Sequence, residues 1–317
     1  MDDDEGEGEE DEVVVEKGGG SRSKSAGGGK PLKRQKRARG GIEELRALQA
    51  YLREKVPVEA VFPSEKLHFN PTGDFKDHTA DNTISVDGFL WDEADVDELV
   101  DAGKLPRNMC LECGSRSTAP LNFVSHSLSI PELNFIFNTQ LAGVGGVSGG
   151  VVVDVGSRLG CVVYAAIVLG GAKEAVGVEL NREMCKVQEV AFQQLGGAGS
   201  RARVICGDIC DQADLLERAR VTVLHNPFQF FTDVASAQMT WRKIASMIAP
   251  GSYIVASPPL CEQLEQAEDP LDLRAWVEEI ETEYPIADDP DDEHAGEDGR
   301  LFTECVLYRV KAKIPYQ

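Results

Sequence analysis

The sequence lacks any apolar run that could cross a membrane. No stretch of about eighteen apolar residues occurs, although hydrophobic residues make up 42% of the 317 positions. The chain begins Met-Asp-Asp-Asp-Glu, whereas a secretory signal peptide begins with basic residues followed by an apolar segment. These absences predict an intracellular protein with no membrane or secretion signal. The apolar content is nevertheless sufficient for a buried core.

Basic residues are scarce relative to acidic ones. Lys and Arg total 32 against 54 Asp and Glu, which gives a formal net charge of −22. Residues 1–41 contain ten acidic and nine basic side chains, so the other 276 residues carry a net charge of −21. A folded part this acidic repels phosphate, which disfavours general nucleic-acid binding. A basic protein partner suits this charge better than RNA, which would need a local basic patch.

Cysteine is too sparse for a disulfide framework. The eight Cys are spread through the chain, which is typical of reduced intracellular thiols. Cys110 and Cys113 form a C-x₂-C pair followed by Gly, as in a zinc knuckle. A structural zinc site needs four ligands, and no second C-x₂-C is present. A Cys₂His₂ site with His126, His68 or His78 therefore competes with a simple tight turn, and we predict no metal site.

Residues 1–41 form a low-complexity tail, which is predicted to be disordered because it has too little apolar surface to fold. The tail contains the basic run Lys30 to Arg39, which resembles a nuclear localisation signal. A solvated basic linker, or a segment that folds back onto the acidic residues 2–12, is the alternative. The basic run leads us to expect a nuclear or nucleocytoplasmic protein.

Two further parts are expected after the tail. Residues 42–128 are predicted to form a small helical and loop-rich extension that starts with a helix over 42–56. The domain over 129–317 begins at Ser129, where Ser-Ile-Pro-Glu forms a capping box. This box predicts a helix over about 130–141.

After Gly150 the pattern changes to alternating strands and helices. The apolar run Val151-Val152-Val153 is typical of a strand that is buried on both faces of a parallel sheet. The alternation predicts a doubly wound α/β fold, in which ligands bind at the carboxyl ends of the strands. The other expected strands are 175–178, 203–206, 221–224, 252–256, 279–286 and 301–310, and the expected helices are 158–170, 181–195 and 233–248.

The turn after the first strand has the composition of a ligand-binding loop. It reads Asp154-Val155-Gly156-Ser157-Arg158-Leu159-Gly160, and glycine lets the backbone turn sharply close to a ligand. Dinucleotide-binding folds require G-x-G-x-x-G, which is absent. The positive ammonium and sulfonium groups of S-adenosylmethionine favour a nearby carboxylate, which Asp154 supplies. The candidate cofactor-binding residues in this turn are Asp154, Gly156, Ser157, Arg158 and Gly160.

Acidic residues also follow the next two expected strands. Glu179 ends the strand Val176-Gly177-Val178, where a carboxylate can accept hydrogen bonds from ribose hydroxyls. Asp208 follows the third strand, where an adenine amino group would need an acceptor. A single carboxylate in such a place often caps a helix, but three after three successive strands indicate a nucleoside site. Leu180 and Ile209, beside these carboxylates, are part of the predicted cofactor site.

Over about residues 150–257 these motifs resemble the class I S-adenosylmethionine-dependent methyltransferases, and the last strand pair extends the resemblance loosely over 258–317. The resemblance implies a seven-stranded methyltransferase-type sheet. It also implies that the first turn lies near the methionine part of the cofactor, with Glu179 at the ribose and Asp208 facing the adenine.

Arg158 departs from the pattern of that family. The family usually has three glycines, two apart, in the first turn, and Arg158 stands at the middle one. Its guanidinium needs a carboxylate partner or room to point away. It could therefore weaken cofactor binding, or it could form a salt bridge with the cofactor's own carboxylate.

The fourth strand ends in His225-Asn226-Pro227-Phe228. Amino-group methyltransferases carry Asn/Asp-Pro-Pro-aromatic here, so the resemblance implies a nitrogen acceptor held by Asn226 and stacked on Phe228, although the second Pro is missing. The segment is also similar to the Asn-Asn-Phe-x-Phe stretch of the non-SET histone-lysine methyltransferases, which share Gly177-Val178-Glu179. The alternative is that the aromatic residues belong to the core and that Asn226 caps a helix.

The combined motifs favour a methyltransferase that transfers the methyl group of S-adenosylmethionine to a nitrogen of a lysine-like protein substrate. An RNA base amino-methyltransferase is the second hypothesis, which Asn226-Pro227-Phe228 supports and the net charge opposes. A catalytically silent scaffold is the third, suggested by Arg158 and the missing proline. A dehydrogenase is least favoured because G-x-G-x-x-G is absent, and the oligomeric state is left open.

Overall fold

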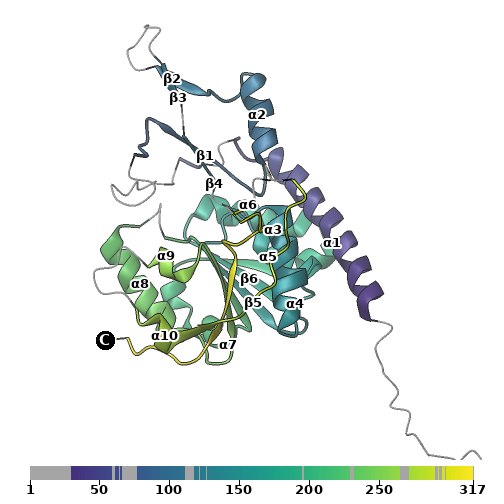
Figure 1. Ribbon diagram of the computed structural model, residues 1–317, viewed down its shortest axis with the longest axis vertical. Coiled ribbons are helices and arrows are strands. Elements are labelled where there is room, and N and C mark those ends of the chain that lie inside the picture. Colours follow the sequence, from purple (N-terminus) through teal and green to yellow (C-terminus); the bar gives the residue numbers. More distant parts are fainter. Residues whose placement is uncertain are drawn as a thin grey trace, which may run out of the picture.

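The protein is described here by a computed structural model (Figure 1). The structure describes residues 30–316 except 59–60, 64, 66–76, 111–117, 121, 126, 195, 229–231, 265–270, 290–291, 293–294 and 297. Within the described part of the chain, no helix is both long and apolar enough to cross a bilayer.

Helix α1 (Lys30–Arg53) begins well before the helix expected over 42–56. Its side chains Leu45, Leu48 and Leu52 are fully buried in the core that also contains the sheet. This apolar stripe anchors the helix, and adding residues to a helix that has already formed avoids the cost of nucleation. The predicted tail boundary at residue 41 is therefore wrong, since residues 30–41 are helical, while residues 1–29 lie outside the described residues.

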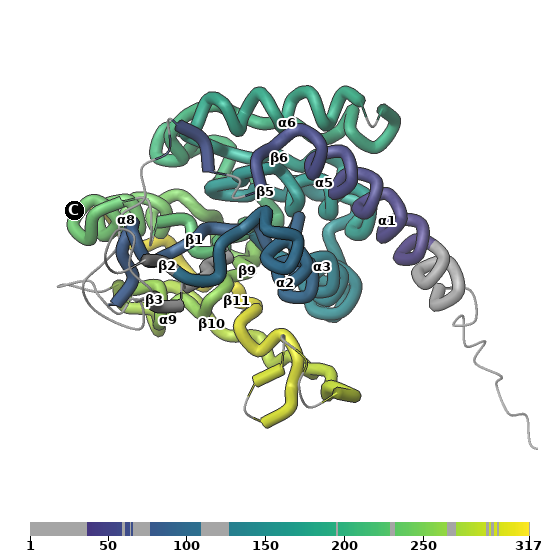
Figure 2. Tube along the Cα trace, turned by 90° about the horizontal axis from the view of Figure 1, so that it is seen from above, coloured from purple at the N-terminus to yellow at the C-terminus, as the bar shows by residue number. Residues whose placement is uncertain are grey.

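Helix α1 packs directly on the main domain. A Cβ atom added to Gly41 would lie 2.7 Å from Cδ2 of Leu169 and 2.9 Å from the carbonyl oxygen of Val168. Only a glycine permits this close approach to the end of α5 (Cys161–Val168). Figures 1 and 2 show α1 lying along α5 at the side of the molecule. The extension therefore shares its core with the domain and is not an independent unit.

The rest of the extension contains short elements. Strand β1 (Thr83–Val86) pairs in parallel with β4 (Asn122–Ser125), although the sequence predicted a loop-rich segment over 57–90. Helix α2 (Glu93–Asp101) starts at a capping box. Strands β2 (Asn108–Cys110) and β3 (Thr118–Pro120) form an antiparallel pair.

The helix that opens the main domain begins as the capping box predicts. Ser129 is the N-cap of α3 (Ile130–Phe135), and its hydroxyl oxygen accepts a hydrogen bond from the Glu132 N–H while Glu132 reaches back to the Ser129 N–H. The predicted helix continues as a π-helix, Ile136–Gln140, and ends as α4 (Leu141–Gly143).

A seven-stranded sheet forms the centre of the molecule, with the strand order β10-β11-β9-β8-β5-β6-β7. Strands β5 to β9 run parallel and β11 runs antiparallel to β9 and β10. The predicted doubly wound, seven-stranded sheet is confirmed. The strands are β5 (Val151–Val155), β6 (Glu174–Glu179), β7 (Ala202–Cys206), β8 (Val221–His225), β9 (Tyr253–Ser257), β10 (Val277–Glu279) and β11 (Val306–Val310).

Helices cover both faces of the sheet. One face packs against α1, α3, α5 and α6 (Arg182–Gln194) around a core that includes Val152 and Val223. The other face packs around Val153 and Leu224. The elements on that second side are α7 (Ala213–Arg218), α8 (Val234–Met247), α9 (Leu260–Gln263) and α10 (Leu273–Trp276). Two short 3₁₀ segments, Gly196–Arg201 and Ile209–Asp211, lie at the two ends of β7.

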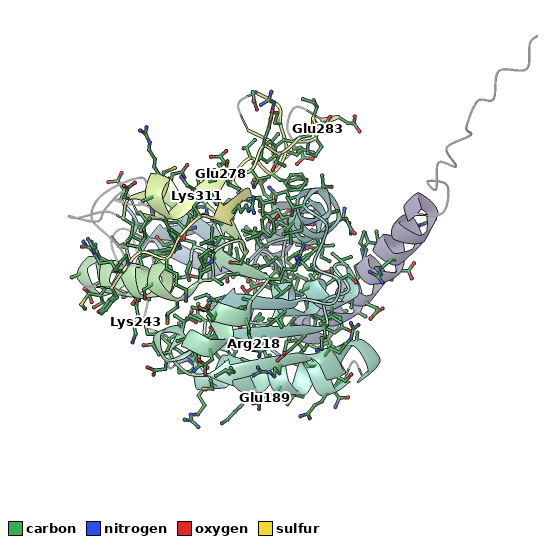
Figure 3. All side chains as sticks on the ribbon, turned by 90° about the horizontal axis from the view of Figure 1, so that it is seen from below. Glu189, Arg218, Lys243, Glu278, Glu283 and Lys311 are labelled. Atoms are coloured by element: carbon green, nitrogen blue, oxygen red, sulfur yellow. The ribbon has the colours of Figure 1, made fainter. Side chains whose placement is uncertain are left out.

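The two closing strands are shorter than predicted. Strand β10 ends at Glu279, so only the first residue of the strand expected over 279–286 is in a strand. Strand β11 starts at Val306, whereas the sequence predicted a start at residue 301. The intervening segment includes the acidic loop, which is joined by isolated bridges such as Ile286–Arg300. Figure 3 shows Glu278 beside the closing strands and Glu283 out on this segment. The apolar residues of this segment, such as Tyr284 and Phe302, pack against Phe135 of α3 and do not extend the sheet.

Candidate functional site

The first turn lies between strand β6 and the loop after β8. Gly156 has a φ of 74°, and its N–H donates to the carbonyl oxygen of Val178 at 2.9 Å. A Cβ atom at Gly156 would lie 3.4 Å from Cβ of Pro227. Gly160 has a φ of 84° and precedes α5, and a Cβ atom there would lie 2.7 Å from the Phe192 ring. The backbone conformation thus favours glycine at both predicted positions, and close packing requires it at Gly160 as well.

Ser157 faces the interior of the domain. Its hydroxyl donates to Oε1 of Gln188 at 3.1 Å. A Cβ atom at Gly177 would lie only 2.3 Å from that hydroxyl oxygen. The structure therefore gives Ser157 a packing role between β6 and α6, and the absent side chain of Gly177 makes room for it.

Asp154 is a buried carboxyl group at the end of β5, with only 4% of its surface exposed. Burial, with a further contribution from the negative charge of Glu179, raises its pKa to about 8. Among the described residues, no group donates a hydrogen bond to its carboxylate. An ionised carboxylate without a partner is costly in such a place, so the site favours a positively charged ligand group beside Asp154.

Glu179 closes the next strand and is held in a fixed orientation. Its Oε2 accepts the backbone N–H of Arg158 at 2.9 Å, and its Oε1 accepts that of Asn181 at 2.8 Å. Burial raises its pKa, and these two hydrogen bonds oppose the shift. The next side chain, Leu180, is 73% exposed. The fixed carboxylate of Glu179 and the exposed side chain of Leu180 are therefore neighbours at this edge of the sheet.

Asp208 follows β7 and is exposed. Its Oδ1 accepts the N–H of Cys210 at 2.7 Å, so it caps the 3₁₀ segment Ile209–Asp211. Ile209 itself is buried. The structure thus gives Asp208 the capping role that was the alternative for a lone carboxylate, and it leaves the residue at the same sheet edge as Glu179.

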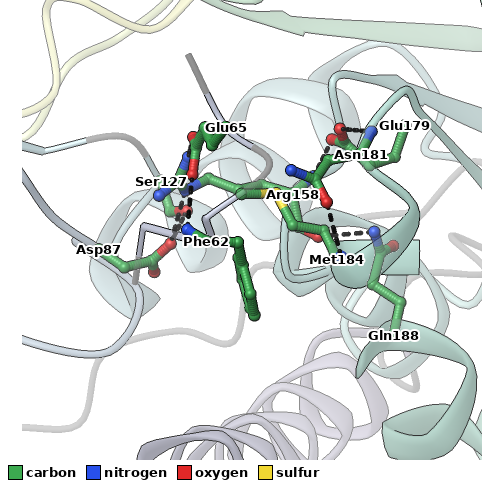
Figure 4. Close-up of polar contacts among 9 residues, drawn as sticks. All are labelled: Phe62, Glu65, Asp87, Ser127, Arg158, Glu179, Asn181, Met184 and Gln188. Atoms are coloured by element: carbon green, nitrogen blue, oxygen red, sulfur yellow. Dashed lines mark hydrogen bonds and ion pairs between the residues drawn. The ribbon is translucent and has the colours of Figure 1, made fainter. Parts of the chain in front are cut away.

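Among the described residues, Arg158 pairs with two carboxylates, and both come from the N-terminal extension. Its Nη1 lies 2.8 Å from Oε1 of Glu65, and its Nε lies 3.2 Å from Oδ2 of Asp87 (Figure 4). The φ of Arg158 is 49°, a left-handed conformation that is uncommon for a residue with a side chain. Neither Glu65 nor Asp87 was a candidate from the sequence, because no local pattern links residues so far apart.

The loop after β8 is only partly as expected. Asn226 has a φ of 42° and is half-buried. The Phe228 ring packs edge-on against Trp241, with 5.2 Å between ring centroids, so it contributes to the core as the alternative proposed. Residues 229–231, which include the other two aromatics of this segment, lie outside the described residues. Asn226 remains a candidate for acceptor binding.

His225 immediately precedes Asn226. Burial lowers its pKa, while the negative charges of Glu132 and Asp87 oppose that shift. Its Nδ1 is buried and has no hydrogen-bond partner among the described residues. A buried imidazole with a lowered pKa therefore lies at the end of β8, with the backbone of Ser257, two carboxylates and the guanidinium of Arg158 in its surroundings.

Most of the candidate zinc ligands lie outside the described residues. Cys110 ends β2, but neither Cys113 nor His126 is described. Within the part of the chain that the structure does describe, no group of three or more His, Cys, Asp or Glu side chains could hold a metal ion.

The sheet topology decides the fold. Parallel strands in the order β7-β6-β5-β8-β9, followed by an antiparallel β11 inserted before β10, make up the methyltransferase-type sheet. The chain has the class I methyltransferase fold. In a methyltransferase fold, the candidate residues after β5, β6, β7 and β8 share the edge of the sheet where ligands bind.

Comparisons with known proteins find only distant similarities. No protein-family model and no curated protein matches the chain. An RNA methyltransferase from Salinibacter ruber in complex with S-adenosyl-L-homocysteine is 16% identical over 56% of this chain and 92% of its own, with a TM-score of 0.36. A mutant of MtNAS in complex with S-adenosylmethionine is 15% identical over 58% of this chain and 63% of its own, with a TM-score of 0.41. At this distance the comparisons identify no substrate.

Proposed function

We propose that this protein is an S-adenosylmethionine-dependent methyltransferase that acts on a nitrogen. The observation that carries the proposal is the buried Asp154 carboxyl group, which has no hydrogen-bond donor among the described residues and a pKa of about 8. The amino acid ammonium group of S-adenosylmethionine would supply the positive charge that stabilises this carboxylate. The residues of the first turn therefore fit the cofactor.

The neighbouring residues suit the nucleoside part of the same molecule. Glu179 is already oriented by two backbone N–H groups, so a carboxylate acceptor stands ready for ribose hydroxyls. Leu180 is 73% exposed and offers an apolar surface to a planar base. Asp208 lies beyond it at the end of β7 and would accept from the adenine amino group. When bound, the cofactor supplies the reactive methyl group.

The acceptor side favours a cationic amine. Glu132 and Asp87 place negative charge near His225, which the positive charge of Arg158 partly offsets, and the 276 residues after the tail carry a net charge of −21. These charges support a lysine-like group of a basic protein as the substrate. Asn226 would orient the nitrogen. His225, which burial keeps neutral, can accept the proton that an ammonium group must lose before its nitrogen can form a bond to the methyl carbon.

Two measurements test this function. Calorimetry should show binding of S-adenosylmethionine or S-adenosylhomocysteine below millimolar concentration, whereas binding of NAD instead would contradict the methyltransferase assignment. Tritiated S-adenosylmethionine should then label basic nuclear proteins, and Asn226→Ala should reduce labelling without changing cofactor affinity. Labelling of RNA would favour the amino-methyltransferase alternative, and cofactor binding without any labelling would favour a scaffold.

The basic run Lys30 to Arg39 supports a nuclear location. Because this run is the start of α1, deleting it would also shorten a helix that packs on the domain. Replacing its Lys and Arg residues by Ala keeps a strong helix former at each position. The tagged variant should shift toward the cytoplasm, and an unchanged distribution would remove this part of the proposal.

A further inference from the structure

Arg158 joins the first turn to the extension through two buried ion pairs. The side chains of Glu65, Asp87 and Arg158 are 5%, 0% and 7% exposed. Figure 4 shows the guanidinium between the two carboxylates. Among the described residues, these two carboxylates share one guanidinium and leave a surplus negative charge in a buried place, and such a charge is costly unless it is compensated.

The two carboxylates are held with unequal strength. Asp87 Oδ2 accepts the Ser127 hydroxyl at 2.6 Å, and its Oδ1 accepts the N–H of Phe89 at 3.1 Å. Glu65 is supported by its own turn, in which the Phe62 N–H donates to Glu65 Oε2 at 3.3 Å. Among the described residues, Glu65 therefore has fewer further hydrogen bonds to lose than Asp87, although its ion pair with Arg158 is the shorter one, at 2.8 Å against 3.2 Å.

Glu65 also adds to the negative charge around the cofactor site. Burial is the main cause of the raised pKa of Glu179, and the charge of Glu65 raises it further. Asp154 lies near Glu179 and adds to the same repulsion. A ligand that brings its own ammonium group together with a carboxylate would relieve this repulsion once its carboxylate replaced that of Glu65.

We propose that the guanidinium of Arg158 is the binding subsite for the carboxylate of the ligand's amino acid part, and that Glu65 occupies this subsite until the ligand binds. The proposal rests on the proposed function. Asp154 and Arg158 belong to one turn and carry opposite charges, as do the ammonium and carboxylate groups of a single amino acid. Asp87 keeps its bond to Arg158 throughout, and only the bond to Glu65 is exchanged.

Calorimetry with two ligands tests this subsite. S-Adenosylhomocysteine carries the amino acid part, and 5′-methylthioadenosine lacks it. Glu65→Gln should tighten binding of S-adenosylhomocysteine about three- to tenfold and leave 5′-methylthioadenosine unchanged. Arg158→Gln should lower only the affinity for S-adenosylhomocysteine, by roughly ten- to a hundredfold, as expected for the loss of a hydrogen bond to a charged group. The control Glu283→Gln removes the same charge from an exposed position and should change neither affinity.

Hydrogen exchange in the wild type provides a second readout that does not depend on a variant. The Glu65 N–H donates to the Phe62 carbonyl oxygen at 2.8 Å, and its exchange should accelerate when S-adenosylhomocysteine binds and Glu65 is displaced. Slower exchange, or weaker binding of S-adenosylhomocysteine by Glu65→Gln, would show that Glu65 is structural and overturn this proposal alone. If neither ligand binds the wild type, the proposed function fails as well.

Discussion

The backbone N–H of Arg158 donates to the carboxylate of Glu179 at 2.9 Å, which ties the turn after β5 to the end of β6. The main chain and the side chain of Arg158 thus contact different parts of the protein. The main chain orients the residue proposed to hold the ribose, and the side chain holds the extension through Glu65 and Asp87. A glycine at this position could provide only the first of these contacts.

Ligand binding should be coupled to proton release at Asp154. Its pKa of about 8 means that the carboxyl group is mostly protonated at pH 7 in the ligand-free protein. A bound ammonium group favours the ionised form, so binding should release up to about one proton at pH 7 and almost none above pH 9. Affinity should therefore rise with pH between about 6 and 8. Calorimetry in two buffers of different ionisation enthalpy measures the proton count, and proton uptake would contradict the prediction.

Asp154→Asn should stabilise the ligand-free protein at neutral and higher pH. The pKa of Asp154 is raised from 3.8 to about 8 on folding. In the unfolded chain Asp154 ionises at a lower pH than it does in the folded protein. The folded protein therefore loses stability as the pH rises from the pKa of the unfolded state to that of the folded state. The amide should recover on the order of a few kcal/mol at pH 8 and almost nothing at pH 3. Thermal unfolding at both pH values measures this difference. Asp208→Asn, an exposed change that keeps a capping side chain, should show no comparable gain.

Leu180→Ser should weaken nucleoside binding without destabilising the fold. Leu180 is 73% exposed, so its replacement should change the free energy of unfolding by less than about 0.5 kcal/mol. Covering a leucine side chain contributes about 1.5–3 kcal/mol, which corresponds to a loss of roughly ten- to a hundredfold in affinity. The matched control is Val190→Ser, at a residue of α6 that is 46% exposed. Equal effects of the two variants on S-adenosylhomocysteine binding would remove Leu180 from the site.

Leu48→Ala should destabilise the whole protein. Leu48 is fully buried in the core shared by α1 and the sheet, and truncation of such a leucine costs about 2–5 kcal/mol. Denaturant unfolding should show one transition that moves as a whole. Arg46→Ala, on the exposed side of the same helix, should have little effect. A separate early transition for α1 would mean that the extension folds independently.

The sequence alone determined the features that depend on local pattern. Strand and helix alternation after Gly150, the capping box at Ser129 and Glu132, and the acidic residues at the strand ends all follow from periods and motifs within a few residues. Neighbouring parallel strands then bring Asp154 and Glu179 close enough for the charge of Glu179 to contribute to the raised pKa of Asp154. The same reasoning placed the first helix too late, because a formed helix extends beyond its apolar stripe.

Only the tertiary structure decided what Arg158 does. Its partners Glu65 and Asp87 lie 93 and 71 residues away along the chain. Whether an ion pair forms over such a separation depends on how the extension packs on the domain, and no sequence period records that packing. The same holds for Phe228, whose ring packs on Trp241 from the following helix. Side-chain direction is set by neighbours that are distant in sequence, so these roles became visible only once the whole chain was folded.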